Sequence, residues 1–225
     1  MELLIPELDE RLAMAAQFFP ACDTGADIGA DHGRLSCFLL DSGKAGRMIV
    51  SDISAESLEK ARRLLSLHHL ENRAEFVVAD GLNAIRNPVE AIAILGMGGA
   101  TAAKILSNDP AALHSAVLIL SAHTDLPLLR RTLEQIDYHL TQEKVVCARH
   151  RYYIILKAER GEERLSAQQV FLGPRLMEAT GMDQTYLKYL EKRMGAYSCM
   201  RAPEAEDYRR WLREEWKRAH DTPCI

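Results

Sequence analysis

Acidic residues follow three successive apolar segments that the sequence predicts to be strands. Asp27 and Asp31 lie in a glycine-bearing turn, Asp52 ends the second segment, and Asp80 with Gly81 ends the third. Because the carboxyl ends of parallel strands meet at one edge of a sheet, we expect these carboxylates to lie close together. In nucleotide-binding sheets an acid at the position of Asp52 holds ribose hydroxyls, and one at Asp80 could accept from an adenine amine.

The turn after the first segment reads Asp-Ile-Gly-Ala-Asp-His-Gly over residues 27–33. This spacing is neither G-x-G-x-x-G nor a P-loop, so it does not favour binding of a pyrophosphate. Its carboxylates suit a cationic or zwitterionic ligand, and the sulfonium and ammonium groups of S-adenosylmethionine fit that description. The alternative is a strand–helix turn without a ligand, and each acid taken singly could be a helix cap or turn residue.

Two further loops follow the next predicted strands. Gly96-Met97-Gly98-Gly99 would leave backbone exposed beside the reactive end of a ligand, or would form a flexible loop at a helix start. His123 follows the fifth strand, where it could contact a substrate, act as a base, or serve as an ordinary surface or capping residue.

Near-continuous apolar strands alternating with helices predict an α/β fold with a mostly parallel, doubly wound sheet. No helix separates the last two strands, so they predict an antiparallel hairpin at the edge of the sheet, with a turn at His150 and Arg151. Beyond residue 160 only helical spacing remains. We therefore predict a sheet domain over residues 1–160 and a small helical domain over residues 161–225. The predicted strands cover residues 24–28, 47–51, 74–79, 91–95, 117–121, 138–147 and 152–158, and the helices between them cover 35–42, 55–69, 100–107 and 126–136.

The composition narrows the class of protein further. The 225 residues are 48% hydrophobic and 27% charged, with a net charge of −4, which is ordinary for a globular protein and unlike a generally basic nucleic-acid binder. Five scattered cysteines without a C-x-x-C pair argue against a metal site and for a reducing, cytoplasmic location. We expect no signal peptide and no membrane span, since no apolar run approaches about 20 residues.

Taken together, these motifs resemble those of class I S-adenosylmethionine-dependent methyltransferases, and more narrowly the bacterial tRNA adenine-22 N1-methyltransferase family. Gly-Met-Gly-Gly stands where methyltransferases of exocyclic amines carry Asn/Asp-Pro-Pro-Tyr, and the Arg-Leu pair at residues 11 and 12 is similar to the start of the family. The sequence departs from the family at Ser121-Ala122-His123, near the expected substrate pocket. The resemblance implies a Rossmann-like, seven-stranded methyltransferase sheet and a coiled-coil-like C-terminal helical domain.

The resemblance and the places of these residues in the predicted fold together suggest roles for individual residues. The expected cofactor-binding residues are Asp27, Gly29, Asp31, His32, Asp52, Ile53, Asp80, Gly81, Gly96 and Met97. The expected catalytic residues are Asp31, which would stabilise the developing charge, Met97, which would line the passage to the base, and His123. The basic residues expected to bind tRNA are Arg34, Arg130, Arg131, Arg151, Lys188 and Lys192, with Arg149 beside them.

Other functions remain open at this point. Any one of the basic residues could be an ordinary solvated charge. The chain could instead methylate a small molecule or another RNA, with the helical region as a lid, or could bind the cofactor without catalysis. The oligomeric state, monomer or weak dimer, is also left open.

Overall fold

The protein is built around one seven-stranded sheet with the order β3-β2-β1-β4-β5-β7-β6. A computed structural model describes residues 7–179 and 183–221. Strands β1 to β5 are parallel, and β7 is antiparallel to both β5 and β6. The predicted fold class is therefore confirmed. The strands are β1 (Cys22–Ile28), β2 (Ala45–Asp52), β3 (Ala74–Val78), β4 (Ala91–Ile94), β5 (Val117–Ala122), β6 (Tyr138–Ala148) and β7 (Arg151–Arg160).

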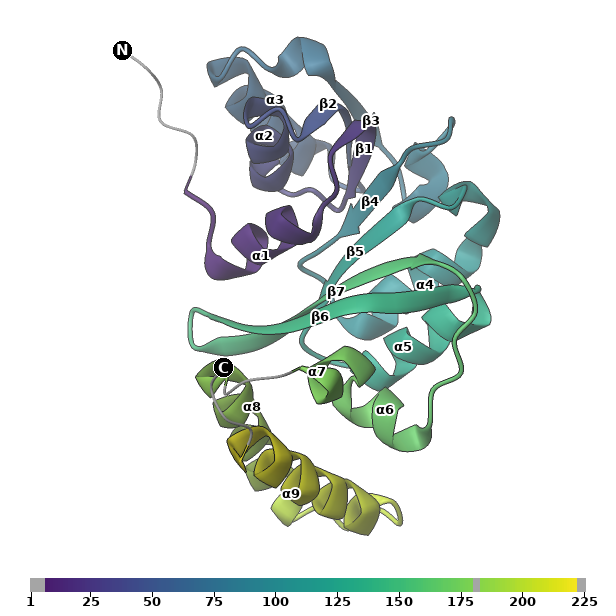
Figure 1. Cartoon of the computed structure of the whole chain (residues 1–225). Coiled ribbons are helices and arrows are strands. Elements are labelled where there is room, and N and C mark those ends of the chain that lie inside the picture. Colours follow the sequence, from purple (N-terminus) through teal and green to yellow (C-terminus); the bar gives the residue numbers. More distant parts are fainter. Residues whose placement is uncertain (1–6, 180–182, 222–225) are drawn as a thin grey trace.

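The central strand β4 is apolar throughout because both faces of the sheet are covered (Figure 1). In β4, Ile92 and Ile94 pack into one buried cluster, and Ala91 and Ala93 pack into a second cluster on the opposite face. Alternation along a strand thus divides the same short segment between two cores. The first face packs against α4 (Gly99–Asn108) and α5 (Leu126–Gln135), and the second against α1 (Glu10–Phe18), α2 (Arg34–Asp41) and α3 (Ala55–Leu67). Short 3-10 turns cover Glu71–Arg73, Gly81–Ala84 and Pro110–Leu113.

The last two strands form a long hairpin that projects beyond the rest of the sheet, between α1 and α8 (Gln184–Ser198) (Figure 1). Its turn consists of Arg149 and His150, which have φ values of 49° and 62°. The turn therefore begins one residue earlier than the sequence predicted. Two consecutive residues with positive φ are typical of a type I′ turn, whose twist matches that of the flanking strands. This geometry holds the basic side chains of the turn at the far end of the hairpin.

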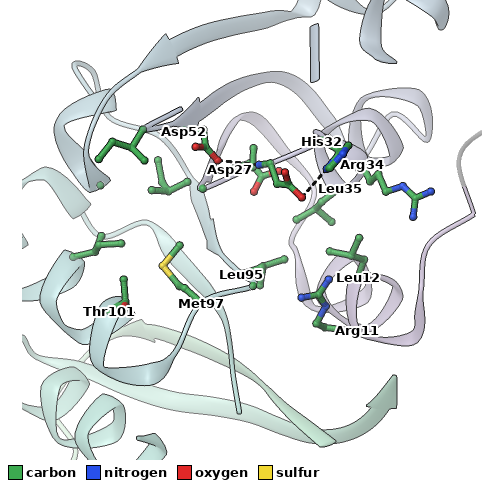
Figure 2. Close-up of a pocket in the computed structure, with 18 of the residues that line it drawn as sticks. Arg11, Leu12, Asp27, His32, Arg34, Leu35, Asp52, Leu95, Met97 and Thr101 are labelled. Atoms are coloured by element: carbon green, nitrogen blue, oxygen red, sulfur yellow. Dashed lines mark hydrogen bonds and ion pairs between the residues drawn. The ribbon is translucent and has the colours of Figure 1, made fainter. Parts of the chain in front are cut away.

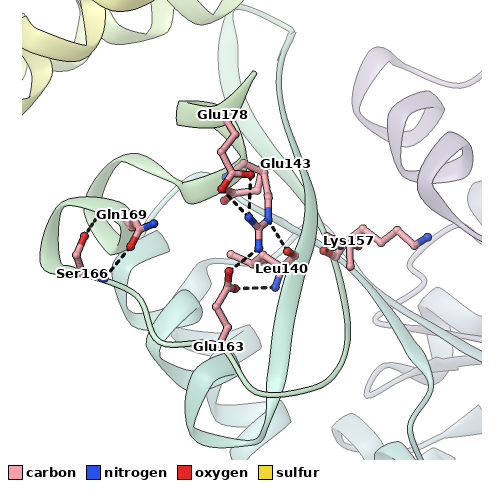
Figure 3. Close-up of polar contacts among 9 residues, drawn as sticks. Leu140, Glu143, Lys157, Glu163, Ser166, Gln169 and Glu178 are labelled. Carbon is pink, nitrogen blue, oxygen red and sulfur yellow. Dashed lines mark hydrogen bonds and ion pairs between the residues drawn. The ribbon is translucent and has the colours of Figure 1, made fainter. Parts of the chain in front are cut away.

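Among the residues that the structure describes, four helices follow the sheet: α6 (Ala167–Leu172), α7 (Pro174–Glu178), α8 and α9 (Ala205–Asp221). Leu172, Leu190 and Leu212 belong to the same buried cluster as the face of the sheet that carries α4 and α5. The Arg175 side chain adds polar links, since it donates to Leu140 O and pairs with Glu163 and Glu178 (Figure 3). The helical region thus packs on β6, and the domain boundary at residue 160 stays a prediction. Within residues 7–179 and 183–221, no helix has the length and apolar character needed to cross a membrane.

Candidate active site

The turns that follow β1 to β4 surround a pocket of about 800 Å³ at the carboxyl edge of the sheet (Figure 2). This volume lies within the range of about 300–1,000 Å³ that is usual for small-molecule sites. The pocket brings together every residue that the sequence predicted to bind a cofactor. These residues are Asp27, Gly29, Asp31, His32, Asp52, Ile53, Asp80, Gly81, Gly96 and Met97.

Asp52 is held in place by backbone groups before any ligand binds. Its Oδ1 accepts from the N–H of Ser54 at 2.8 Å, and its Oδ2 accepts from the N–H of Asp31 at 3.2 Å. A carboxylate has about four acceptor positions, so two remain for a ligand. Asp52 can therefore accept from a pair of hydroxyl groups without rearranging.

Asp27 lies deeper than the other acids, with 3% of its surface exposed. Burial raises the pKa of its carboxyl to about 6, the negative charge of Asp52 adds to this effect, and a hydrogen bond from Ser36 opposes it. The Ser36 Oγ donates to Asp27 Oδ2 at 2.8 Å. Asp27 thus supplies a titratable charge at the floor of the pocket.

Glycine is required after β1 because the turn there is both left-handed and crowded. Gly29 has a φ of +73°, and a Cβ atom built on it would lie 2.7 Å from the Met97 Cε. The Met97 side chain therefore packs directly over the first turn. This contact places the loop after β4 against the loop after β1, at the middle of the pocket.

Asp31 and His32 form an exposed pair at the mouth of the pocket. Asp31 Oδ2 lies 2.6 Å from His32 Nδ1, and the two side chains are 67% and 57% exposed. The left-handed backbone of Asp31, with a φ of 47°, turns its carboxylate toward this histidine. Asp31 is thus placed where a charge that develops on a bound substrate could reach it, and its catalytic role stays a prediction.

Arg11 and Tyr153 also belong to this region, although sequence reasoning assigned neither to the site. Arg11 lines the pocket from the start of α1, and its guanidinium lies over the Tyr153 ring at 5.3 Å. His123 also meets the Tyr153 ring, in an edge-on arrangement with ring centroids 5.6 Å apart. His123 is outside the lining of the pocket, but its loop is tied to the glycine loop because Gly99 N–H donates to Thr124 O. The sequence could not predict this cluster of Arg11, His123 and Tyr153. The three residues come from α1, from the loop after β5 and from β7, which are far apart in the sequence and come together only in the folded protein.

The structure contradicts one of the predicted tRNA-binding residues. Arg130 is 1% exposed and pairs with buried Glu143 at 2.8 Å, so its guanidinium cannot reach a phosphate. Arg131 is partly exposed, but its guanidinium already donates to Glu134 and to the carbonyl of Leu165. Arg34 lines the pocket, yet its side chain points away from it in Figure 2.

The remaining predicted basic residues lie on the β6–β7 hairpin and on α8. Arg149, in the hairpin turn, lines the pocket, and Arg151 is exposed beside it. Lys192 on α8 lies over the Tyr152 ring at 5.4 Å, and Lys188 is exposed one helical turn away. The hairpin thus connects the pocket to the exposed face of α8.

Comparison with known proteins gives the same class as the fold and the pocket. Residues 8–156 match the family model of the methyltransferase domain, so the chain belongs to the methyltransferases with this Rossmann-like domain. A Bacillus subtilis tRNA (adenine(22)-N(1))-methyltransferase is 31% identical over 158 residues, which are 69% of this chain and 66% of that relative. A relative from Mycoplasma pneumoniae is 30% identical over 173 residues, which are 72% and 76% of the two chains. Within the class, the chain belongs to the family that contains these bacterial proteins.

Solved structures extend the likeness in fold to the C-terminal helices. The M1A22 tRNA methyltransferase of B. subtilis superposes with a TM-score of 0.80 at 24% identity, covering 96% of this chain and 99% of that one. A Mycoplasma capricolum relative in complex with S-adenosylhomocysteine gives 0.82 at 20% identity, covering 93% and 98%. The predicted helical C-terminal region is therefore part of a shared architecture.

Proposed function

We propose that this protein is an S-adenosylmethionine-dependent methyltransferase that methylates N1 of an adenine in tRNA, of the adenine-22 type. The observation that carries the proposal is the placement of Asp31, Asp52 and Asp80 in one pocket, after three adjacent strands. Membership in a family that contains a tRNA (adenine(22)-N(1))-methyltransferase supports the substrate. A tRNA substrate also supports action in the cytoplasm.

The residues of the pocket fit the proposed cofactor chemically. Asp52 keeps acceptor positions for the two ribose hydroxyls, and Asp80 can accept from the adenine amine. Ile53, which is 72% exposed, and Ile105 supply apolar surface for a purine ring. Five acids in one pocket favour a ligand that carries a sulfonium and an ammonium group.

The reaction requires little acid–base chemistry from the protein. When bound, S-adenosylmethionine supplies a methyl group on a sulfonium sulfur, which keeps the electrons of the bond that breaks. Adenine N1 forms the new bond with its own lone pair, so no residue has to remove a proton first. The adenine becomes cationic, and Asp31 at the mouth of the pocket would stabilise that charge. The rest of the rate enhancement comes from positioning the base in line with the methyl group, beside Met97 and the glycine loop.

The basic surface from the hairpin turn to α8 supports the choice of tRNA over a small molecule. Arg149, Arg151, Lys188 and Lys192 lie on elements that meet beside the pocket, although the chain as a whole carries a net charge of −4. Such side chains bind phosphates and fix the orientation of an RNA without reading its sequence.

The proposal is tested by methylation of defined transcripts. Purified protein, tritium-labelled S-adenosylmethionine and an unmodified tRNA with adenine at position 22 should give labelled 1-methyladenosine. The same transcript with guanine at position 22 should remain unlabelled. Asp52→Asn should abolish most of the label, because it removes a charged acceptor for the ribose. Asp23→Asn, an exposed acid at the opposite end of β1, is the matched control and should retain it.

Two outcomes would contradict the proposal. Equal labelling of both transcripts would place the methyl group on another nucleotide. Labelling of a small-molecule extract but of no tRNA would favour a small-molecule methyltransferase. If millimolar S-adenosylmethionine also fails to raise the melting temperature, the protein does not bind this cofactor, since a ligand of the native state stabilises it by mass action.

A further inference from the structure

One charged group of the proposed cofactor, the α-carboxylate of its methionine part, has no partner among the acids that line the pocket. Asp9, Asp27, Asp31, Asp52 and Asp80 all line the pocket, and each suits a hydroxyl, an amine or a cation. The methionine part of S-adenosylmethionine also carries an α-carboxylate, which these acids repel. A site that binds the whole molecule therefore needs a cation at its methionine end.

Three of the four basic side chains that line the pocket are poorly placed for this task. His32 is paired with Asp31, and the Arg34 side chain points out of the pocket (Figure 2). Arg149 is exposed in the hairpin turn. Arg11 remains, and Figure 2 shows its guanidinium directed toward Leu95, at the end of β4.

Arg11 is held firmly although it is a long side chain. It is the second residue of α1, whose N-cap Asp9 accepts from the N–H of Leu12 at 3.0 Å. Its Nη2 lies 3.5 Å from the Asp9 carboxylate, and its guanidinium covers the Tyr153 ring. The side chain is 23% exposed. Such a side chain has lost most of its rotamer freedom before a ligand arrives, so binding costs it little further entropy.

The guanidinium of Arg11 also lies next to the turn that follows β4, which lines the pocket. Its Nε is buried and has no hydrogen-bond partner among the residues that the structure describes. A Cβ atom built on Gly96 would lie 3.6 Å from Arg11 Nη1, so the guanidinium lies beside the backbone of the turn that follows β4.

We infer that Arg11 binds the α-carboxylate of the cofactor's methionine and that Tyr153 is a positioning residue for its guanidinium. The inference rests on the proposed cofactor and names a residue that would hold one of its groups. A phosphate of the RNA would carry the same kind of charge. The limited exposure of Arg11 and its place next to Gly96 favour the carboxylate, because phosphates of a folded RNA reach the exposed Arg149 and Arg151 more easily.

The test compares two ligands that differ in this one group. Isothermal titration gives the affinities for S-adenosylmethionine and for decarboxylated S-adenosylmethionine, which keeps the sulfonium and the amine. The wild type should prefer the complete molecule by about 10- to 100-fold, the range of a charge-assisted hydrogen bond. Arg11→Gln should reduce that preference to about 3-fold or less. Damage to the fold alone would weaken both ligands and leave their ratio unchanged.

Two matched variants examine the positioning role and the specificity of the effect. Tyr153→Leu removes the ring face and should lower the preference, whereas Tyr153→Phe keeps the face and should retain it. Arg34→Gln, which removes an arginine that points out of the pocket, should also leave the ratio unchanged.

The outcomes separate this inference from the proposed function. If Arg11→Gln binds both ligands with the wild-type ratio, Arg11 does not bind the carboxylate. If the same variant instead raises only the KM for tRNA, the anion is an RNA phosphate, and the inference is equally wrong. If the wild type binds neither ligand, the proposed cofactor itself is wrong.

Discussion

Replacing Asp27 with Asn should make the stability of the protein less dependent on pH. Burial raises the pKa of the Asp27 carboxyl from 3.8 to about 6, and Ser36 donates to it at 2.8 Å. Asn has nearly the same shape, and its amide oxygen can accept the same hydrogen bond. The substitution therefore removes the titration of this group with little change in packing.

The direction in which the free energy of unfolding changes with pH follows from which state, folded or unfolded, binds the proton. Between pH 3.8 and about 6 the folded protein keeps the proton on Asp27 and the unfolded chain releases it. The free energy of unfolding therefore falls as the pH rises through this window. At about 1.4 kcal/mol per pH unit, this group costs the wild type up to about 3 kcal/mol by pH 7. The stability of Asp27→Asn relative to wild type should increase by the same amount between pH 4 and pH 7.5.

Urea denaturation at closely spaced pH values measures this difference. The fluorescence of Trp211 and Trp216, the two tryptophans of the chain, reports on the unfolding of α9. Circular dichroism reports on the unfolding of the whole protein. Ser36→Ala is an informative companion variant. It removes a hydrogen bond that lowers the pKa of Asp27, so the loss of stability should begin at the same pH but continue to a higher pH. The account would be refuted if the difference in free energy of unfolding between Asp27→Asn and wild type did not change with pH. A difference that changed in the opposite direction would refute it as well.

Three further predictions concern other parts of the molecule. Arg130→Met should lower the free energy of unfolding by about 3–5 kcal/mol, because it leaves buried Glu143 without its partner, and replacing both by Met should recover part of the loss in the same urea assay. Lys188→Glu with Lys192→Glu should weaken tRNA binding and reduce the slope of log affinity against log salt by about 2, with unchanged cofactor affinity by titration. His123→Ala should slow methyl transfer at least about tenfold at saturating cofactor if this side chain contacts the base, and an unchanged single-turnover rate would exclude that contact.

The acids of the pocket could be predicted from sequence because their placement needs only local information. Each follows an apolar strand, and parallel strands bring their carboxyl ends to one edge whatever the rest of the chain does. The glycine turns are similarly local, since Gly29 and Gly96 have positive φ values that favour glycine. These features depend on strand direction and turn geometry, which short patterns encode.

The prediction that Arg130 binds tRNA was wrong because the surroundings of this residue depend on two irregular features. It lies between Leu129 and Leu133, on the buried side of α5, where an arginine needs a buried partner. That partner is Glu143, which a register shift between Leu140 and Gln142 turns toward the core. Simple alternation along β6 would have left Glu143 on the other face, so the sequence gives no sign of the pair.

The meeting of Arg11 and Arg149 in one pocket could not be predicted from sequence patterns, for a different reason. The two residues lie far apart in the sequence. The packing of α1 against the β6–β7 hairpin brings both of them to the same pocket. No spacing rule relates residues so far apart in the chain. The same limit applies to Tyr153, which meets Arg11 and His123 from β7.

The β6–β7 hairpin also fixes the distance between the pocket and the proposed RNA surface. Its turn places Arg149 at the pocket, and Tyr152 on its second strand lies under Lys192 of α8. Arg175 ties α7 to β6, the strand that leads into this turn. A shift of the helical region would therefore pull on the hairpin that lines the pocket. If α8 binds phosphates of the RNA as proposed, this connection would let those contacts help to set the position of the base at Met97.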